Sequence, residues 1–160
     1  MRSLTLAALA VSIALCACSP GQPTPPAASA AAPSTPTARA SATLGDTVLQ
    51  VSTVPLADLG DAVASRYGID LRGEGVLLLV TVRNAAGDAI DVADLQLDAT
   101  ATVLPQGPVA LPLRRIETAG LTDYIGVLET RPPATVQFRI TAAHGGARAE
   151  ISTSADLQPH

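Results

Sequence analysis

Short runs of alternating apolar and polar residues, separated by turn-forming residues, follow one another from Leu44 to the end of the chain. No other feature of the sequence constrains the fold as strongly. The run at 95–104 places an apolar residue at nearly every second position, as in a strand with one buried face. The run at 76–83, VLLLVTVR, is almost entirely apolar and predicts a central strand buried on both faces. Many short strands separated by turns are typical of a β-sandwich or barrel.

Seven or eight strands are predicted in this domain, which we place at residues 44–160. Turn-forming residues separate them at 84–88, 105–108, 131–133 and 144–146. Pro112 restricts its run to a sheet edge, because proline has no amide hydrogen to donate. The predicted strands cover residues 46–54, 76–83, 89–92, 95–104, 109–116, 121–128, 135–141 and 147–153.

One short helix is predicted at Asp61–Tyr67. Val63 and Tyr67 would share the face that docks on the sheet, and Gly68 would end the helix in a left-handed conformation. Asp58 and Asp61, near its start, are interpreted as capping or helix-dipole partners rather than as catalytic acids. A helix this short is not stable alone, so we expect it to pack against the sheet.

The first 17 residues, MRSLTLAALAVSIALCA, have the layout of a bacterial secretion signal. Arg2 supplies the positive charge at its start. The uncharged apolar run at 4–15 is too short to cross a bilayer, which takes about 20 residues. We therefore expect this segment to direct export and then to be removed.

The end of the signal, Leu15-Cys16-Ala17-Cys18, resembles the lipobox of bacterial lipoproteins. Cys18 fits, because a leucine lies three residues before it and a small residue immediately before it. The chain has no cysteine beyond these two, so an exported domain could form no disulfide of its own. The alternative is an ordinary cleaved signal with two incidental cysteines, but it does not explain why both cysteines lie at the cleavage site and none lies elsewhere. The resemblance implies acylation of Cys18, with palmitate as a typical chain, and Ser19 in place of Asp implies the outer membrane.

Residues 18–43 contain the lipidated cysteine and a stretch rich in Pro and Ala. Such a segment has almost no large apolar side chain with which to offset its ordering entropy. We therefore predict a disordered tether that holds the domain away from the bilayer. The alternative, a Pro-rich ligand for a recognition module, lacks a basic flank.

The composition argues against several classes of function. The net charge is −4, and the chain has two Tyr, one Phe and no Trp, which is unlike a nucleic-acid-binding surface. There is no Gly-x-Ser-x-Gly motif, and a chain without Lys cannot contain a Ser-x-x-Lys pair. An acylated Cys18 leaves no free thiol as a nucleophile. We expect a protein that is not an enzyme and that needs no cofactor.

Metal binding has little support in the sequence. His144, at a predicted hairpin tip, is interpreted as a solvated turn residue, and His160 ends the chain; neither belongs to a cluster with ligand spacing. Asp88, Asp91 and Asp94 recur at every third position of a loop and raise the possibility of calcium, but they lack EF-hand spacing. Solvated turn acids are the simpler interpretation.

Three residues are candidates for an interaction surface: Tyr67, Arg114 and Arg115. The two arginines are the only adjacent basic pair, on the predicted edge strand, where charge discourages unwanted strand pairing. The alternative is that they contact an acidic or phosphate-bearing partner. Tyr67 is interpreted as an aromatic residue that docks the helix, although its hydroxyl can still face a groove.

The stretch AVASRYGIDLRGEGVLLLVTVR, residues 62–83, resembles a proteobacterial domain-of-unknown-function family, the one numbered 4426. The matching positions are Tyr67, Gly68, Ile69, Val80, Val82 and Arg83, and Tyr124-Ile125 also fits. The resemblance would cover about residues 46–157, and it implies an exported, immunoglobulin-like antiparallel β-sandwich without assigning an activity. Family members tend to have Tyr and Asn in the first strand, where this chain has Val51, Ser52 and Thr53.

Two functions are therefore expected from the sequence. The first is a non-enzymatic lipoprotein of the cell envelope, anchored through Cys18, whose domain contacts another envelope protein, for example by strand addition at a sheet edge. The second is a small-ligand-binding lipoprotein with a groove beside the Asp61–Tyr67 helix.

Overall fold

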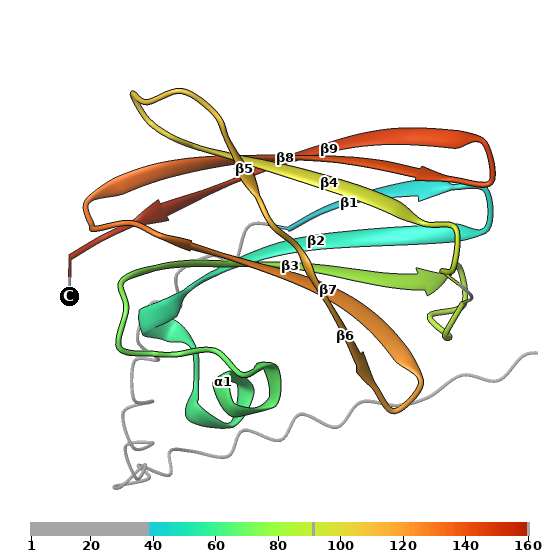
Figure 1. Ribbon diagram of the computed structural model, residues 1–160, viewed down its shortest axis with the longest axis horizontal. Coiled ribbons are helices and arrows are strands. Elements are labelled where there is room, and N and C mark those ends of the chain that lie inside the picture. Colours follow the sequence, from blue (N-terminus) through green and yellow to red (C-terminus); the bar gives the residue numbers. More distant parts are fainter. Residues whose placement is uncertain (1–38, 91, 160) are drawn as a thin grey trace, which may run out of the picture. The chain divides into compact units, whose positions relative to one another are not determined.

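The computed structural model describes residues 39–90 and 92–159. Within them, nine strands form two antiparallel sheets that pack face to face (Figure 1). The predicted antiparallel β-sandwich with one short α-helix is confirmed, although the described residues form nine strands instead of the seven or eight predicted. The predicted signal sequence, Cys18 and the tether up to residue 38 lie outside the described residues. None of the helices in the described ranges is long and apolar enough to cross a membrane.

Sheet A has the strand order β1-β2-β3-β7-β6, and sheet B has the order β5-β4-β8-β9. The strands of sheet A are β1 (Arg39–Leu44), β2 (Thr47–Pro55), β3 (Gly75–Asn84), β6 (Arg114–Thr118) and β7 (Leu121–Glu129). Those of sheet B are β4 (Gln96–Val103), β5 (Val109–Leu111), β8 (Ala134–His144) and β9 (Ala147–Leu157). The pairing of β3 with β7 brings together residues that are distant in the chain, from Val82 with Thr122 to Gly75 with Glu129.

The main hydrophobic core lies between the two sheets. The inward residues of the central strands β3 and β8 are almost fully inaccessible to solvent; they are Val76, Leu78, Val80, Val82, Val136, Phe138 and Ile140. The alternate residues Leu77 and Leu79 of β3 point to the other face of sheet A, where they pack in a second, smaller core under helix α1. β3 is therefore buried on both faces along its first half, as its continuous apolar sequence predicts.

Helix α1 spans Asp61–Tyr67, as predicted, and Gly68 ends it at φ 60°. Its start differs from the prediction, because Gly60 is the N-cap and no side chain caps the helix. Asp61 still lies in the first turn, where a negative charge suits the helix dipole. The predicted docking face is also wrong at Val63, which is 37% exposed. The small residue Ala64 faces the sheet instead, because Leu56 and Leu59 from the preceding segment already occupy the second core.

A strand that the sequence does not predict, β1, precedes the predicted strand at 46–54, which is β2. The tether was expected to reach residue 43, but Arg39–Leu44 pairs with β2 along its whole length. No proline follows Pro36 before this strand, so every backbone amide is available for the ladder. Ala40 and Ala42 pack against the core, and Leu44 is buried in it.

The predicted strand at 109–116 is in fact two strands in different sheets. β5 lies at the edge of sheet B, and β6 lies at the edge of sheet A. The chain crosses from one sheet to the other at Pro112, which cannot donate a ladder hydrogen bond. The predicted edge position is therefore confirmed, whereas the single strand is wrong.

The predicted strand at 89–92 does not form in the described part of this loop. The preceding turn closes on itself, because the Asn84 amide donates to the Asp88 carbonyl at 3.0 Å and the Asp88 amide donates to the Asn84 side chain at 2.8 Å. Val92 is buried in the main core without ladder pairing. The apolar pattern at 89–92 thus reflects burial of a loop.

Candidate functional site

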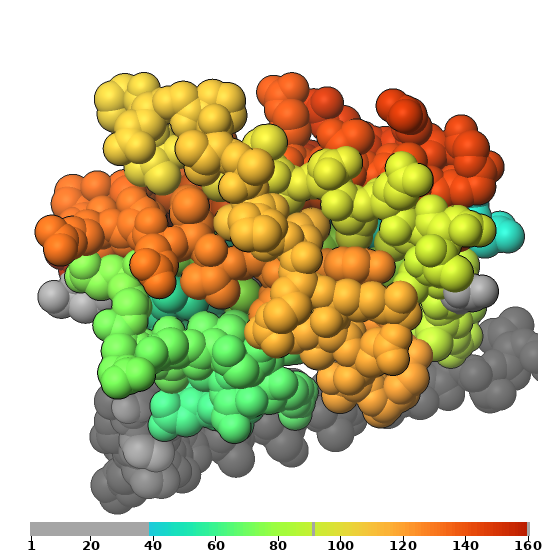
Figure 2. All heavy atoms as spheres, in the orientation of Figure 1, coloured from blue at the N-terminus to red at the C-terminus, as the bar shows by residue number. Residues whose placement is uncertain are grey.

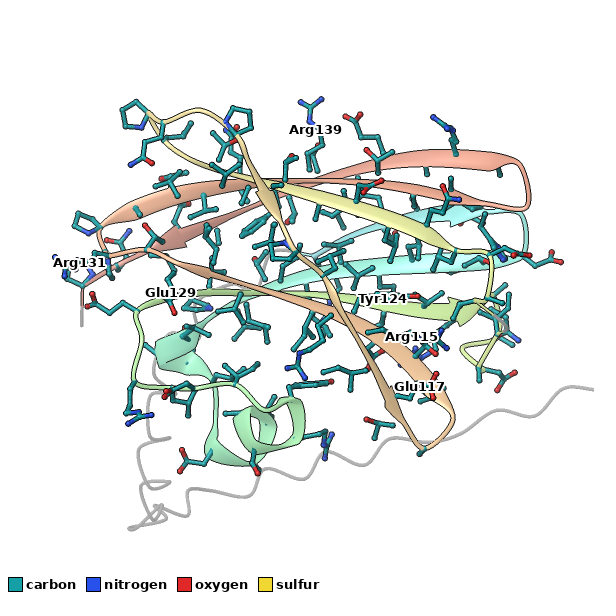
Figure 3. All side chains as sticks on the ribbon, in the orientation of Figure 1. Arg115, Glu117, Tyr124, Glu129, Arg131 and Arg139 are labelled. Carbon is teal, nitrogen blue, oxygen red and sulfur yellow. The ribbon has the colours of Figure 1, made fainter. Side chains whose placement is uncertain are left out.

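The three candidate interaction residues do not form one group in the structure. The Arg114 guanidinium donates a hydrogen bond to the carbonyl of Tyr67, the last residue of α1. This contact places a cation at the C-terminal end of the helix, where backbone carbonyls concentrate negative partial charge. Arg115 is the next residue of the same strand, so its side chain points to the opposite face, and it pairs with Glu117 at 2.5 Å (Figure 3). Tyr67 and Arg114 meet, and Arg115 lies apart from them.

A mostly buried ion pair joins β3 and β7 on the outer face of sheet A. The Arg83 guanidinium donates to Asp123 Oδ1 at 2.9 Å and to the carbonyl oxygens of Val82 and Thr122 at 2.7 and 2.8 Å. The side chains of Arg83 and Asp123 are only 17% and 9% exposed, so solvent and salt screen their attraction weakly. The pair joins the end of β3 to the start of β7.

Tyr67 connects this ion pair to the helix. Burial raises the pKa of the Tyr67 hydroxyl above its ordinary 10.0, and the charge of Asp123 and a hydrogen bond to that carboxylate raise it further. Arg66 and Arg83 act in the opposite direction. The raised pKa keeps the hydroxyl protonated at neutral pH. Tyr67 thus accepts a hydrogen bond from Arg114 of β6 at its carbonyl, and its hydroxyl lies close enough to Asp123 of β7 to feel that charge.

A groove of about 340 Å³ lies between the loop that follows α1 and the edge of sheet A; we call it the α1 groove. Its apolar lining includes Leu56, Ile125 and Val127, and three charged residues, Asp70, Arg114 and Glu129, also line it. Figure 2 shows the two sides of this region on one face, the green surface of the helix and its loop beside the gold surface of β6. The α1 groove thus lies beside the loop that follows the helix, and no residue of Asp61–Tyr67 itself lines it.

The charges around the groove are not equally available. The Arg72 backbone amide and guanidinium donate to the Asp70 carboxylate, the closest at 2.8 Å, and these hydrogen bonds lower the pKa of Asp70 to about 2. Arg114 is engaged with the Tyr67 carbonyl. Across the described part of the chain, no side chain pairs with Glu129, whose carboxylate is exposed.

The α1 groove has the chemistry of a recognition surface. Its apolar lining favours an aliphatic group, and its rim carries charges of both signs that can orient a polar neighbour. Within 39–90 and 92–159, no three residues of the metal-binding types gather closely enough to hold an ion.

Two other sequence candidates have specific positions. His144 is the last residue of β8, half-buried, and its Nδ1 lies 3.0 Å from the hydroxyl of the fully buried Thr47. The interpretation of His144 as a solvated tip residue is therefore wrong; Gly145 and Gly146 make the turn. Asp88 hydrogen-bonds within its own turn, whereas Asp91 and His160 lie outside the described residues.

The sequence alone does not identify Asp123 as a functional residue, and it points to Arg83 only through the family resemblance. A weak signal exists, since an aspartate interrupts the apolar sequence of β7, LTDYIGVLE. Its partner could not be identified, because the pairing of β3 with β7 does not follow chain order.

A similar solved structure supports this fold. In the solved structures, the chain is similar to a DUF4426 family protein from Pseudomonas aeruginosa PAO1, with a TM-score of 0.59 and 16% sequence identity over 76% of this chain and 96% of that one. A second match is FetP of uropathogenic E. coli strain F11, with a TM-score of 0.49 and 10% identity over 76% of this chain and 95% of that one. No curated protein matches the sequence. The sequence pattern of the family Domain of unknown function (DUF4426) matches residues 41–157, which is most of the chain. The chain therefore belongs to the DUF4426 family.

Proposed function

We propose that this chain is a lipid-anchored protein of the bacterial cell envelope whose β-sandwich binds a partner protein through the α1 groove and catalyses no reaction. The anchor would be Cys18, and the expected address is the outer membrane, facing the periplasm. Removal of residues 1–17 would leave a Pro- and Ala-rich segment between the lipid and β1, long enough to let the domain move away from the bilayer.

The anchor rests on the spacing of Leu15, Ala17 and Cys18 in the sequence. Stable attachment to a bilayer takes more than one acyl chain, which an acylated N-terminal cysteine would provide. Replacing Cys18 by Ala should move the protein from the membrane fraction to the soluble periplasmic fraction. The matched control is Cys16→Ala, which keeps a small residue in the signal and should leave the protein on the membrane. Equal membrane partitioning of both variants would overturn the anchor.

The partner-binding role rests on one observation above all, the exposure of Val127 in the α1 groove. This aliphatic side chain is 37% exposed although it belongs to an interior strand of sheet A. Next to it, Ile125 is almost fully buried by α1, so the covered apolar surface ends at Val127. An apolar residue of a partner placed there would extend this buried surface, and Glu129 and Arg114 would restrict its orientation.

The groove suits this role better than strand addition does. β6, the edge strand beside the groove, is short and carries Arg114, Arg115 and Glu117, which discourage pairing with another strand. At the other side of the sandwich, β1 lies against β9, so neither strand offers an isolated edge. Recognition through side chains in the groove requires no free edge.

A pair of substitutions tests the groove. Val127→Glu places a second carboxylate beside Glu129, at an exposed position where folding tolerates charge. Val109→Glu is the matched control, since Val109 is 53% exposed on β5 of the other sheet. After crosslinking of the envelope, the wild-type protein and the control should recover the same partner band, and Val127→Glu should lose it. Equal recovery from all three proteins, or no partner from any of them, would contradict the proposal.

The second candidate function is binding of a small ligand in the same groove. The volume of about 340 Å³ favours it, because small-molecule sites begin at about 300 Å³. A ligand should be released when protein purified from its envelope is denatured, and mass spectrometry should detect it in the wild-type sample but not with Val127→Glu. An empty wild-type protein together with a recovered protein partner would decide for the first function.

A further inference from the structure

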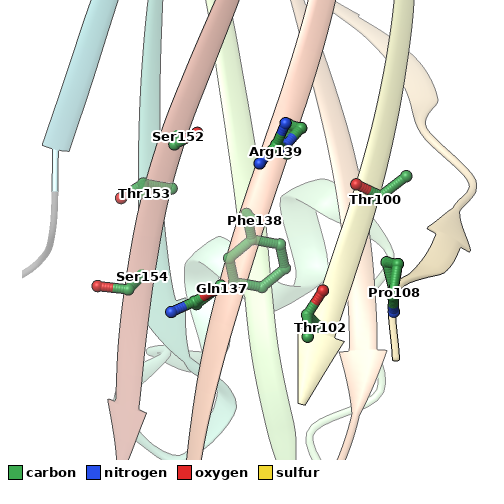
Figure 4. A pocket seen from close by; sticks show the side chains of 9 residues that line it. All are labelled: Thr100, Thr102, Pro108, Gln137, Phe138, Arg139, Ser152, Thr153 and Ser154. Carbon is green, nitrogen blue, oxygen red and sulfur yellow. The ribbon is translucent and has the colours of Figure 1, made fainter. Parts of the chain in front are cut away.

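The outer face of sheet B carries a second recess, on the other sheet from the α1 groove and about 660 Å³ in volume (Figure 4). Strand register arranges its side chains in two rows across β4, β8 and β9. Thr100, Arg139 and Ser152 form one row, and Thr102, Gln137 and Ser154 form the other. Pro108, from the loop that precedes β5, also lines the recess.

The hydroxyl and amide groups of these rows lack side-chain hydrogen bonds to the described residues, whereas the Arg139 guanidinium has a partner. Among the described residues, no hydrogen bond engages the side chains of Thr100, Thr102, Gln137, Ser152 or Ser154. Two other polar side chains on this face have partners: Thr135, outside the recess, donates to Asp156 at 2.7 Å, and Arg139, in the lining, pairs with Glu150 at 3.2 Å. The hydroxyl and amide groups of the recess are therefore free to bind a ligand, and its one charged side chain is paired.

The recess is close to neutral, and Pro108 is the one exposed, wholly apolar side chain in its described lining. Arg139 supplies the only charge in its lining, and Glu150 offsets that charge. Phe138 belongs to the lining but is only 1% exposed, since its ring is buried in the core. A nucleic acid would need more cationic groups, and an apolar protein segment would need exposed aliphatic side chains.

We propose that this face of sheet B binds a neutral, hydroxyl-rich oligosaccharide. A sugar chain presents donors and acceptors on every ring, which matches four hydroxyls and one amide that can each donate and accept. The volume lies within the range of pockets that hold organic ligands, and it is open enough for a chain of several rings. Without an aromatic ring on which to stack, a Kd of about 1 mM is expected, because exposed neutral hydrogen bonds each add little net affinity.

The test is an NMR titration of the isotope-labelled full chain with three probes. Two are neutral, a tetramer of N-acetylglucosamine and maltotetraose, and the third is a sulfated tetrasaccharide. At least one neutral probe should shift the amide signals of the recess residues and leave those of the α1 groove unchanged. Absence of shifts with both neutral probes at saturating concentration, shifts confined to the α1 groove, or binding of the sulfated probe alone would overturn the proposal.

Hydroxyl deletion supplies the second readout. The double variant Thr100→Val/Thr102→Val removes two hydroxyls and keeps β-branched side chains, which suit a strand. It should weaken binding about fivefold or more, since two hydrogen bonds are lost. The matched control is Thr141→Val, which lies on the same face of β8 but outside the recess and should leave affinity unchanged. Unchanged binding by the double variant, or equal loss in the control, would contradict the assignment.

Discussion

Replacing Asp123 by Ala should destabilise the domain more than any single change on its surface. The carboxylate is 9% exposed and lies 2.9 Å from the Arg83 guanidinium. Unit charges about 4 Å apart attract by about 4 kcal/mol at the effective dielectric constant of a protein. Removing one partner of a buried pair typically costs about 3–5 kcal/mol, because the remaining charge is left desolvated. Arg83 keeps the carbonyls of Val82 and Thr122, so the lower end, about 3 kcal/mol, is expected.

Urea denaturation of the purified wild-type and variant proteins measures this loss. A loss of about 3 kcal/mol also corresponds to a Tm about 10 °C lower for a domain of this size. The control is Glu150→Ala, which removes an exposed pair with Arg139 and should cost less than about 1 kcal/mol. A double variant with Arg83→Met should recover part of the loss, because the unpaired charge is gone. If Asp123→Ala costs no more than the control, the argument from burial is wrong.

Two further predictions concern close packing and titration. Gly75→Ala should lower the free energy of unfolding, measured by denaturation, by about 3 kcal/mol or more, because the new Cβ would overlap a carbonyl of β7. The control is Gly107→Ala, which has open space around it and should be almost neutral. Equal stabilities of the two variants would contradict this packing. The pKa of Tyr67 can be followed by tyrosinate absorbance in a Tyr124→Phe background, and it should lie above 10.0. Asp123→Asn should lower that pKa only in part, since burial is the larger cause of the shift. Because the folded-state pKa is raised, the associated stability is present below pH 10 and is lost as the pH rises through the folded pKa; a pKa at or below 10.0 would contradict the burial of the hydroxyl.

Local sequence patterns predicted the elements of this fold well. The continuous apolar run predicted β3 as a central strand, and the two glycines after His144 predicted the β8–β9 turn. Gly68 gave the end of α1 because only a residue that tolerates positive φ suits that position. Each of these features depends on residues that are neighbours in the chain.

What could not be predicted depends on contacts between distant segments. β1 is a strand because β2 offers it a partner, although its Ala- and Ser-containing sequence resembles the tether before it. The strands on either side of Pro112, β5 and β6, belong to different sheets. No pattern among neighbouring residues indicates that the chain changes sheets there. The pair of Arg83 and Asp123, and with it the attachment of Tyr67, exists only once β3 and β7 are neighbours.

A photocrosslinking amino acid introduced at Val127, in cells that produce the full chain, tests the proposed function most directly. Illumination should join the membrane-bound protein to one envelope protein, and the same amino acid at Val109 should give no such product. The two positions are both exposed valines, one in the α1 groove and one on the opposite sheet. Equal crosslinking from both positions, or none at Val127 in membrane-bound protein, would contradict the groove as a partner-binding surface.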